Sequence, residues 1–166
     1  MWGLMIVSYL CIAISIILLA ITGLQGYFQF HLMQANHPTF ALFTAIFYMF
    51  TETLVMFYFI GSGTAIKKSI KMGGGEPGLY EKVKKTKMIL FPHLTMNMLF
   101  IGTVFILGGA VQTGSVPGWM HGLLFDLAFI HFLYVIVIQH RGFKENVEII
   151  GKIAIIEGTA ANNSPA

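Results

Sequence analysis

Two acidic side chains lie inside long apolar stretches of the sequence, where an ionisable group is costly unless it has a partner. Glu52 lies in one stretch and Asp126 in another, whereas the other five acidic residues lie among the basic ones. A helix rise of about 1.5 Å per residue places Glu52 and His131 at similar depth on different helices. Tyr48 lies one turn from Glu52 on the same helix face. An ion pair or hydrogen bond between Glu52 and His131 is therefore feasible, as a structural clasp or as part of a proton or quinone pathway.

Three histidines fall near one end of these stretches. His31 and His37 lie in the first connection, and His121 lies just inside the fourth stretch. Imidazole nitrogen is a common ligand of copper and zinc, so the three rings form a candidate metal site. Their spacing matches no metal-binding signature, and the alternative interpretation is that they are solvated at the membrane surface.

Two further histidines, His93 and His140, lie near the opposite ends of the third and fourth stretches. They are candidate axial ligands of a b-type haem, which in a helix bundle needs two facing imidazoles at nearly equal depth. Their predicted depths differ by about 5 Å. The alternative is that His93 caps a neighbouring helix end while His140 reaches toward the membrane interface.

The composition explains why these polar groups stand out. Hydrophobic residues make up 56% of the 166 residues and charged residues 10%, against about 25% charged in an ordinary soluble domain. A soluble protein of this size could not bury so much apolar surface in one core, so lipid is the expected solvent. The formal charge of +3 does not indicate a nucleic-acid partner, because the basic residues are confined to two segments.

Four apolar stretches reach the roughly 20 residues that a helix needs to cross a hydrocarbon core. They span residues 3–24, 39–60, 89–111 and 119–139. Short first and third connections make two antiparallel hairpins, so we predict an all-α membrane four-helix bundle over residues 1–141. No internal repeat is evident, although the two hairpins could share a fold without sharing sequence.

The basic residues predict the orientation of the bundle. Seven of the ten lie between the second and third stretches, the other three follow the fourth, and the connections 25–38 and 112–118 contain none. Cytoplasmic loops carry the excess of Lys and Arg, so both chain termini are expected in the cytoplasm, most simply at a bacterial cytoplasmic membrane.

Two other segments carry structural predictions. The Gly-Ser-Gly-Thr run at 61–64 is expected to end the second helix, followed by a flexible linker around 73–78. Residues 142–166 are expected to form a cytoplasmic segment, in which 143–156 is a short amphipathic helix at the membrane interface and 158–166 a frayed tail.

The span count and the histidines near helix ends resemble, in general arrangement, the four-span anchor and cytochrome b subunits of respiratory complexes. Polar side chains that face outward in several directions from the fourth stretch, the short extramembrane parts and the many aromatic residues favour an accessory transmembrane subunit of a redox or energy-transducing complex that contacts haem b or quinone. Besides lipid, the expected partners are then other membrane subunits or further copies of the chain, and no catalysis by the chain alone is expected.

Two other functions fit the same residues. A small oligomeric transporter would use Glu52, Asp126 and His131 to line a proton, ion or solute path, although broken helices and inverted repeats are not evident. A metal-binding membrane enzyme or metal-insertion factor would use the histidines of the first connection and His121. No Ser-His-Asp or Cys-His set can be placed at one depth.

Overall fold

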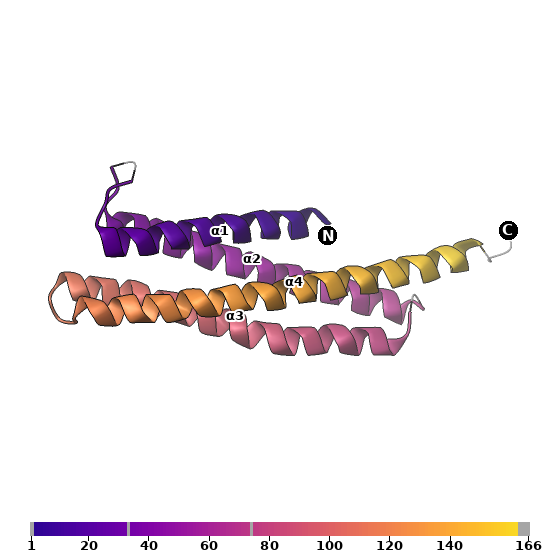
Figure 1. Cartoon of the computed structure of the whole chain (residues 1–166). Coiled ribbons are helices and arrows are strands. Elements are labelled where there is room, and N and C mark those ends of the chain that lie inside the picture. Colours follow the sequence, from indigo (N-terminus) through magenta and orange to yellow (C-terminus); the bar gives the residue numbers. More distant parts are fainter. Residues whose placement is uncertain (1, 33, 74, 163–166) are drawn as a thin grey trace.

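The computed structural model describes residues 2–32, 34–73 and 75–162, and these ranges contain four long helices and no extended strand (Figure 1). Each helix is long and apolar enough to cross a membrane, and together they form the predicted four-helix bundle. The helices are α1 (Trp2–Phe28), α2 (His37–Lys71), α3 (Pro77–Gln112) and α4 (Gly118–Asn162).

The two ends of the bundle differ in character. The connections 29–36 and 113–117 lie together at one end, here called the turn end (Figure 1). The connection 72–76 lies at the other end, here called the lysine end because all ten basic residues fall on that side. At the turn end, Asn36 Oδ1 accepts a hydrogen bond from the Thr39 backbone N at 3.1 Å, which caps the start of α2.

α2 does not end at residues 61–64, so that prediction is wrong, and the helix continues to Lys71. Ser62 and Gly63 are buried there. Asn146 Nδ2 donates to Ser62 Oγ at 2.7 Å, and the Lys87 side chain packs where a Cβ on Gly63 would stand. The intrinsic cost of glycine in a helix, about 1 kcal/mol, is therefore offset by close packing of α2 against α3 and α4.

The segment 143–156 is helical, but it continues α4 without a break and does not form a separate helix. Ile149 and Ile153 pack with Ile66 of α2 and Val83 of α3 in a buried cluster at the lysine end. Ile149 and Ile153 therefore contact protein neighbours, whereas Ile155 and Ile156 of the same segment are exposed. The helix also covers 158–162 of the tail expected to be frayed, and residues 163–166 lie outside the described part of the chain.

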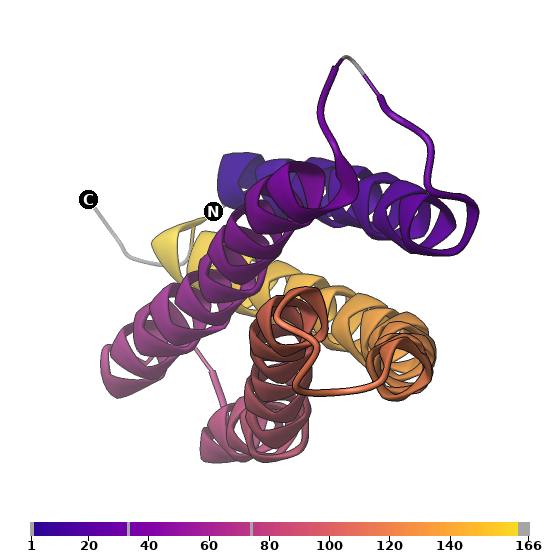
Figure 2. The same cartoon turned by 90° about the vertical axis from the view of Figure 1, so that its left-hand side faces the viewer.

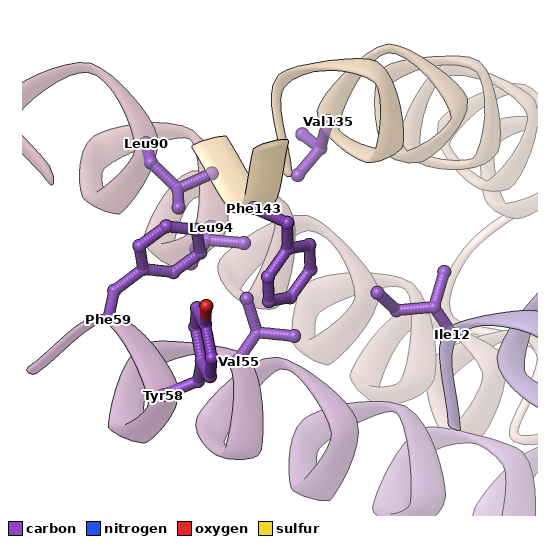
Figure 3. Close-up of a cluster of buried hydrophobic side chains, with 8 residues drawn as sticks. All are labelled: Ile12, Val55, Tyr58, Phe59, Leu90, Leu94, Val135 and Phe143. Atoms are coloured by element: carbon purple, nitrogen blue, oxygen red, sulfur yellow. The ribbon is translucent and has the colours of Figure 1, made fainter. Parts of the chain in front are cut away.

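The central core joins all four helices. Figure 3 shows Phe59 of α2 and Phe143 of α4 side by side, with Ile12 of α1 and Leu90 of α3 in the same cluster. The two phenyl centroids are 5.1 Å apart, within the range of favourable aromatic pairs.

The hairpins α1–α2 and α3–α4 bury equivalent positions, although their sequences differ. Five of the six buried α1 residues have a buried counterpart 82 positions later in α3, and seven of the ten buried α2 residues have one 84 positions later in α4. The α1 and α3 pairs are Ser8/Leu90, Ile12/Leu94, Ser15/Asn97, Leu19/Ile101 and Thr22/Val104. The α2 and α4 pairs include Thr44/Ala128, Tyr48/Phe132, Thr51/Val135, Val55/Gln139, Phe59/Phe143 and Ser62/Asn146.

Several of these counterparts touch each other across the α2–α4 interface. The rings of Tyr48 and Phe132 have centroids 5.1 Å apart, in addition to the Phe59–Phe143 and Ser62–Asn146 contacts. A residue meets its own counterpart only near a twofold axis. The bundle therefore has an approximate internal twofold axis, which runs between α2 and α4 along the length of the bundle.

Candidate functional site

A cavity of about 1100 Å³ opens between the two hairpins at the turn end. Figure 2 views the bundle from this end, with α1–α2 above α3–α4. All four helices contribute to its lining, which is mainly apolar, with Leu19 and Phe105 among the lining residues. The polar side chains that reach it include His37, His121 and Asp126. A large apolar cavity with a few convergent polar groups is the usual form of a binding site for a small molecule or cofactor.

His37 and His121 face each other in this cavity. His37 is the first residue of α2 and His121 lies in the first turn of α4. They are 84 positions apart, so they are counterparts across the internal twofold axis. Their ring centroids are 6.1 Å apart and the ring planes are inclined by 74°. The two rings therefore come from different hairpins and meet at equal depth.

Each hairpin holds its histidine in the same way. A Cβ on Gly26 would lie 3.3 Å from Cε1 of His37, and a Cβ on Gly108 would lie 3.3 Å from Cε1 of His121. The two glycines are 82 positions apart, as counterparts in α1 and α3 are. Glycine therefore leaves the space into which each imidazole packs.

The helix turn before each glycine also contacts the ring. The backbone of Thr22 interacts with His37, and the backbone of Val104 interacts with His121. Both Nδ1 atoms are buried, and within the described ranges neither has a partner with full hydrogen-bond geometry. Both rings thus lie beside the backbone of the neighbouring helix and line the cavity.

Asp126 has a partner from α1. Tyr27 donates its hydroxyl to Asp126 Oδ2 at 2.6 Å, and both residues line the cavity. The Tyr27 ring packs on Gly122, where a Cβ would lie 3.4 Å from the hydroxyl oxygen. This bond ties α1 to α4 beside the histidine pair.

Glu52 pairs with Gln139 and not with His131. Gln139 Nε2 donates to Glu52 Oε2 at 2.7 Å, and both side chains are fully buried. The Oε1 atoms of both residues have no hydrogen-bond partner in the described part of the chain. The expected contact with His131 does not form because that ring points toward α3.

His131 joins a hydrogen-bonded series that crosses three helices. Its Nδ1 lies 2.7 Å from Asn97 Oδ1, and Asn97 Nδ2 donates to the Tyr48 hydroxyl at 2.6 Å. On the other side, His131 Nε2 lies 3.4 Å from Nδ1 of His93. The predicted polar residues Tyr48 and His131 are therefore connected, but through Asn97, and Glu52 is not a member of the series.

The structure does not bring the predicted haem pair His93 and His140 together. The Tyr9 hydroxyl of α1 lies 2.9 Å from His140 Nδ1, whereas His93 contacts His131. Nine residues separate His131 from His140, which at about 100° per residue places them on opposite sides of α4. His140 therefore faces α1 while His131 faces α3.

The three-histidine metal site is also only partly assembled. His37 and His121 meet, but His31 is exposed in the connection 29–36. Within residues 2–32, 34–73 and 75–162, no three His, Cys, Asp or Glu side chains converge as metal ligands would.

Sequence reasoning missed Gly26, Gly108, Asn97 and Gln139. A signal was present for the glycines, since each hairpin has a glycine near the end of its first helix and a histidine early in its second. The spacings differ, with 11 residues from Gly26 to His37 and 13 from Gly108 to His121, so a search for an exact repeat does not find them.

No protein family, curated protein or solved structure matches this chain in sequence or fold.

Proposed function

We propose that this chain is a transmembrane electron-transfer subunit of a membrane redox complex, and that it binds one b-type haem through His37 and His121. The observation that carries the proposal is the histidine pair, one ring from each hairpin at 6.1 Å, in the cavity at the turn end.

The separation of the two rings fits a shared metal ion. A metal-bound imidazole nitrogen lies about 2.0–2.1 Å from the metal, with the ring centre roughly 1.1 Å further away. Two opposed imidazoles then have centroids about 6.3 Å apart, close to the observed 6.1 Å. Histidine ligands of metals commonly direct the second ring nitrogen at a backbone carbonyl, and the backbone of Thr22 and of Val104 is suitably placed.

The cavity also has room for a macrocycle. Its volume of about 1100 Å³ reaches the upper end of ordinary cofactor pockets, which span about 300–1,000 Å³. The apolar lining suits a porphyrin, and the packing of the rings on Gly26 and Gly108 keeps the space clear of side chains. Copper or zinc is the weaker candidate, because two protein ligands fill only half of the four positions usual at a structural zinc site.

The same geometry favours an electron carrier over an enzyme. When bound, the haem would supply one-electron chemistry, and the chain's own residues hold its ring and exclude water. If His37 and His121 both held the haem, they would leave no iron position free for a substrate. Electrons must then come from and go to other subunits or diffusible carriers, which is why we propose a subunit of a larger complex.

The transporter alternative has less support. Glu52 contacts Gln139, Asp126 contacts Tyr27, and His131 contacts Asn97. These three contacts are separate and do not form one polar path through the bundle.

The orientation belongs to the same proposal. The lysine end carries all ten basic residues, so it is assigned to the cytoplasm of a bacterial cell together with both termini. The turn end and its histidine pair then lie in the outer half of the membrane.

The test is haem binding by the purified chain. The full-length protein is expressed with added haem precursor, purified in mild detergent and examined for a Soret band and pyridine haemochrome. We expect about one haem per chain, and loss of the band when either His37 or His121 is replaced by alanine.

Matched controls use the histidines outside the cavity. His31→Ala and His140→Ala should keep the Soret band, since neither ring is part of the pair. A colourless protein, or a band that survives His37→Ala and His121→Ala but not His140→Ala, would overturn the proposal. Circular dichroism of each variant separates loss of ligand from loss of fold.

A further inference from the structure

The series Tyr48–Asn97–His131–His93 ends at the outer surface of α3 and α4. Tyr48 and Asn97 are fully buried, whereas His131 and His93 are partly exposed. Tyr134, which is 55% exposed, packs its ring against His93 with centroids 5.5 Å apart. The series thus runs from the core to a surface within the predicted membrane spans.

The direction of the hydrogen bonds along the series determines whether its exposed end, Nε2 of His93, is an acceptor or a donor. Asn97 donates through Nδ2 to Tyr48, so its Oδ1 is an acceptor and His131 Nδ1 carries the hydrogen. In neutral rings, His131 Nε2 is then an acceptor, His93 Nδ1 is the donor, and His93 Nε2 presents a lone pair outward. A half-turn of the Asn97 amide reverses every bond in the series and makes His93 Nε2 a donor.

The first hairpin is an internal control for these residues. The positions in α1 and α2 that correspond to His93, His131 and Tyr134 hold Cys11, Phe47 and Phe50. Phe50 is 56% exposed, almost as much as Tyr134. The same bundle surface is therefore built once with a cysteine and two phenylalanines, and packing alone does not require two histidines and a tyrosine hydroxyl on the other face.

We infer that the face formed by His93, His131 and Tyr134 binds the head group of a lipid-soluble quinone or quinol. The two redox forms of such a molecule present a carbonyl or a hydroxyl at the same oxygen. A terminal nitrogen that is an acceptor in one direction of the series and a donor in the other matches both forms. The location fits as well, because a polar group at the lipid-facing surface is costly unless a ligand or a partner covers it.

This site is separate from the histidine pair at the turn end, and its test does not need haem. The full chain in lipid nanodiscs is labelled with a photoactivatable short-chain benzoquinone, and the labelled peptides are identified by mass spectrometry. We expect label in the α3 and α4 peptides that contain His93 and Tyr134, and competition by the unmodified quinone.

The variant that tests the site copies the first hairpin. His131→Phe and Tyr134→Phe give these two positions the same residue type as their counterparts Phe47 and Phe50. His93→Leu replaces the third group without introducing a thiol that would add to quinones. Together they should lower quinone affinity by about tenfold or more, since both imidazole rings and the tyrosine hydroxyl are lost. Phe50→Tyr is the matched control and should leave affinity unchanged.

Three outcomes would overturn the inference. The label could map to the cavity at the turn end, the triple variant could bind as the unchanged chain does, or Phe50→Tyr could reduce binding equally. If the triple variant fails to fold, His93→Gln alone keeps a polar side chain in the membrane. It should still weaken binding, because the glutamine amide does not reproduce the ring's position.

Discussion

The two hairpins share one burial pattern but differ in the chemistry placed on it. Phe59 and Phe143 are identical counterparts in the core, and His37 and His121 are identical counterparts at the turn end. Elsewhere the second hairpin carries polar groups where the first has Phe47 and Cys11. The shared burial pattern identifies what the bundle needs in order to pack, and the differences identify residues that the fold does not require.

The buried carboxylate of Glu52 is another position at which the two hairpins differ. The counterpart of Glu52 is Ile136 and the counterpart of Gln139 is Val55, and Ile136 packs against the apolar cluster that contains Val55. One polar pair and its apolar equivalent thus lie in the same core. The structure favours a clasp between α2 and α4, since the carboxylate is sealed from the surface.

The largest effect is expected at the identical core pair. Phe59→Ala and Phe143→Ala should each lower the free energy of unfolding by about 3 kcal/mol, because each removes a buried ring from the centre of the bundle. Equilibrium unfolding in mixed detergent micelles measures the loss. The double variant should lose less than the sum of the two single losses, since the rings contact each other.

Phe57→Ala is the control, because this neighbouring ring is 61% exposed and its loss should change stability little. Clearly unequal losses at Phe59 and Phe143 would show that the two halves are not energetically equivalent.

The next effect concerns the clasp. Gln139→Val should destabilise the bundle by about 2 kcal/mol, because it leaves Glu52 buried without its hydrogen-bond donor. Adding Glu52→Ile should restore most of the loss, since both positions then hold the residues of their counterparts. Unfolding in mixed micelles gives both values, and a double variant that is as unstable as Gln139→Val would contradict the correspondence between the halves.

The smallest effect is expected at the polar pair near the lysine end. Ser62→Ala should cost about 1 kcal/mol through loss of the bond from Asn146. Exchanging the two residues, with Ser62→Asn and Asn146→Ser together, should cost less, because each side chain then occupies its counterpart's place near the axis. If the exchange costs more than Ser62→Ala, the axis does not hold in this part of the bundle.

The sequence predicts the four helices and their antiparallel pairing, because length and hydropathy determine them almost alone. It fails at the helix ends. Gly63 suggests a helix end when only local propensity is considered, whereas packing with Lys87 and Val83 keeps α2 helical. The continuation of α4 past residue 142 depends likewise on contacts with α2 and α3 that no local pattern reveals.

The sequence predicts which residue types form the candidate site but not which side chains pair with each other. His37 and His121 were recognisable as possible ligands, but the choice of partners depends on the rotation of each helix about its axis. That rotation pairs His37 with His121 and turns His93 toward His131, away from His140. Depth estimates from residue counts do not include this rotation, which is why the pairs Glu52–His131 and His93–His140 were not found in the structure.

The twofold relation also has a consequence for how the protein is made. The ribosome delivers α1 and α2 first, so His37 enters the membrane without a partner until the start of α4 follows 84 residues later. A hairpin inserted upside down would carry its histidine to the opposite side of the bilayer. If the chain binds a ligand through both rings, as we propose, binding would succeed only after both hairpins have inserted in the same direction. Once bound, such a ligand stabilises the correctly inserted chain by mass action.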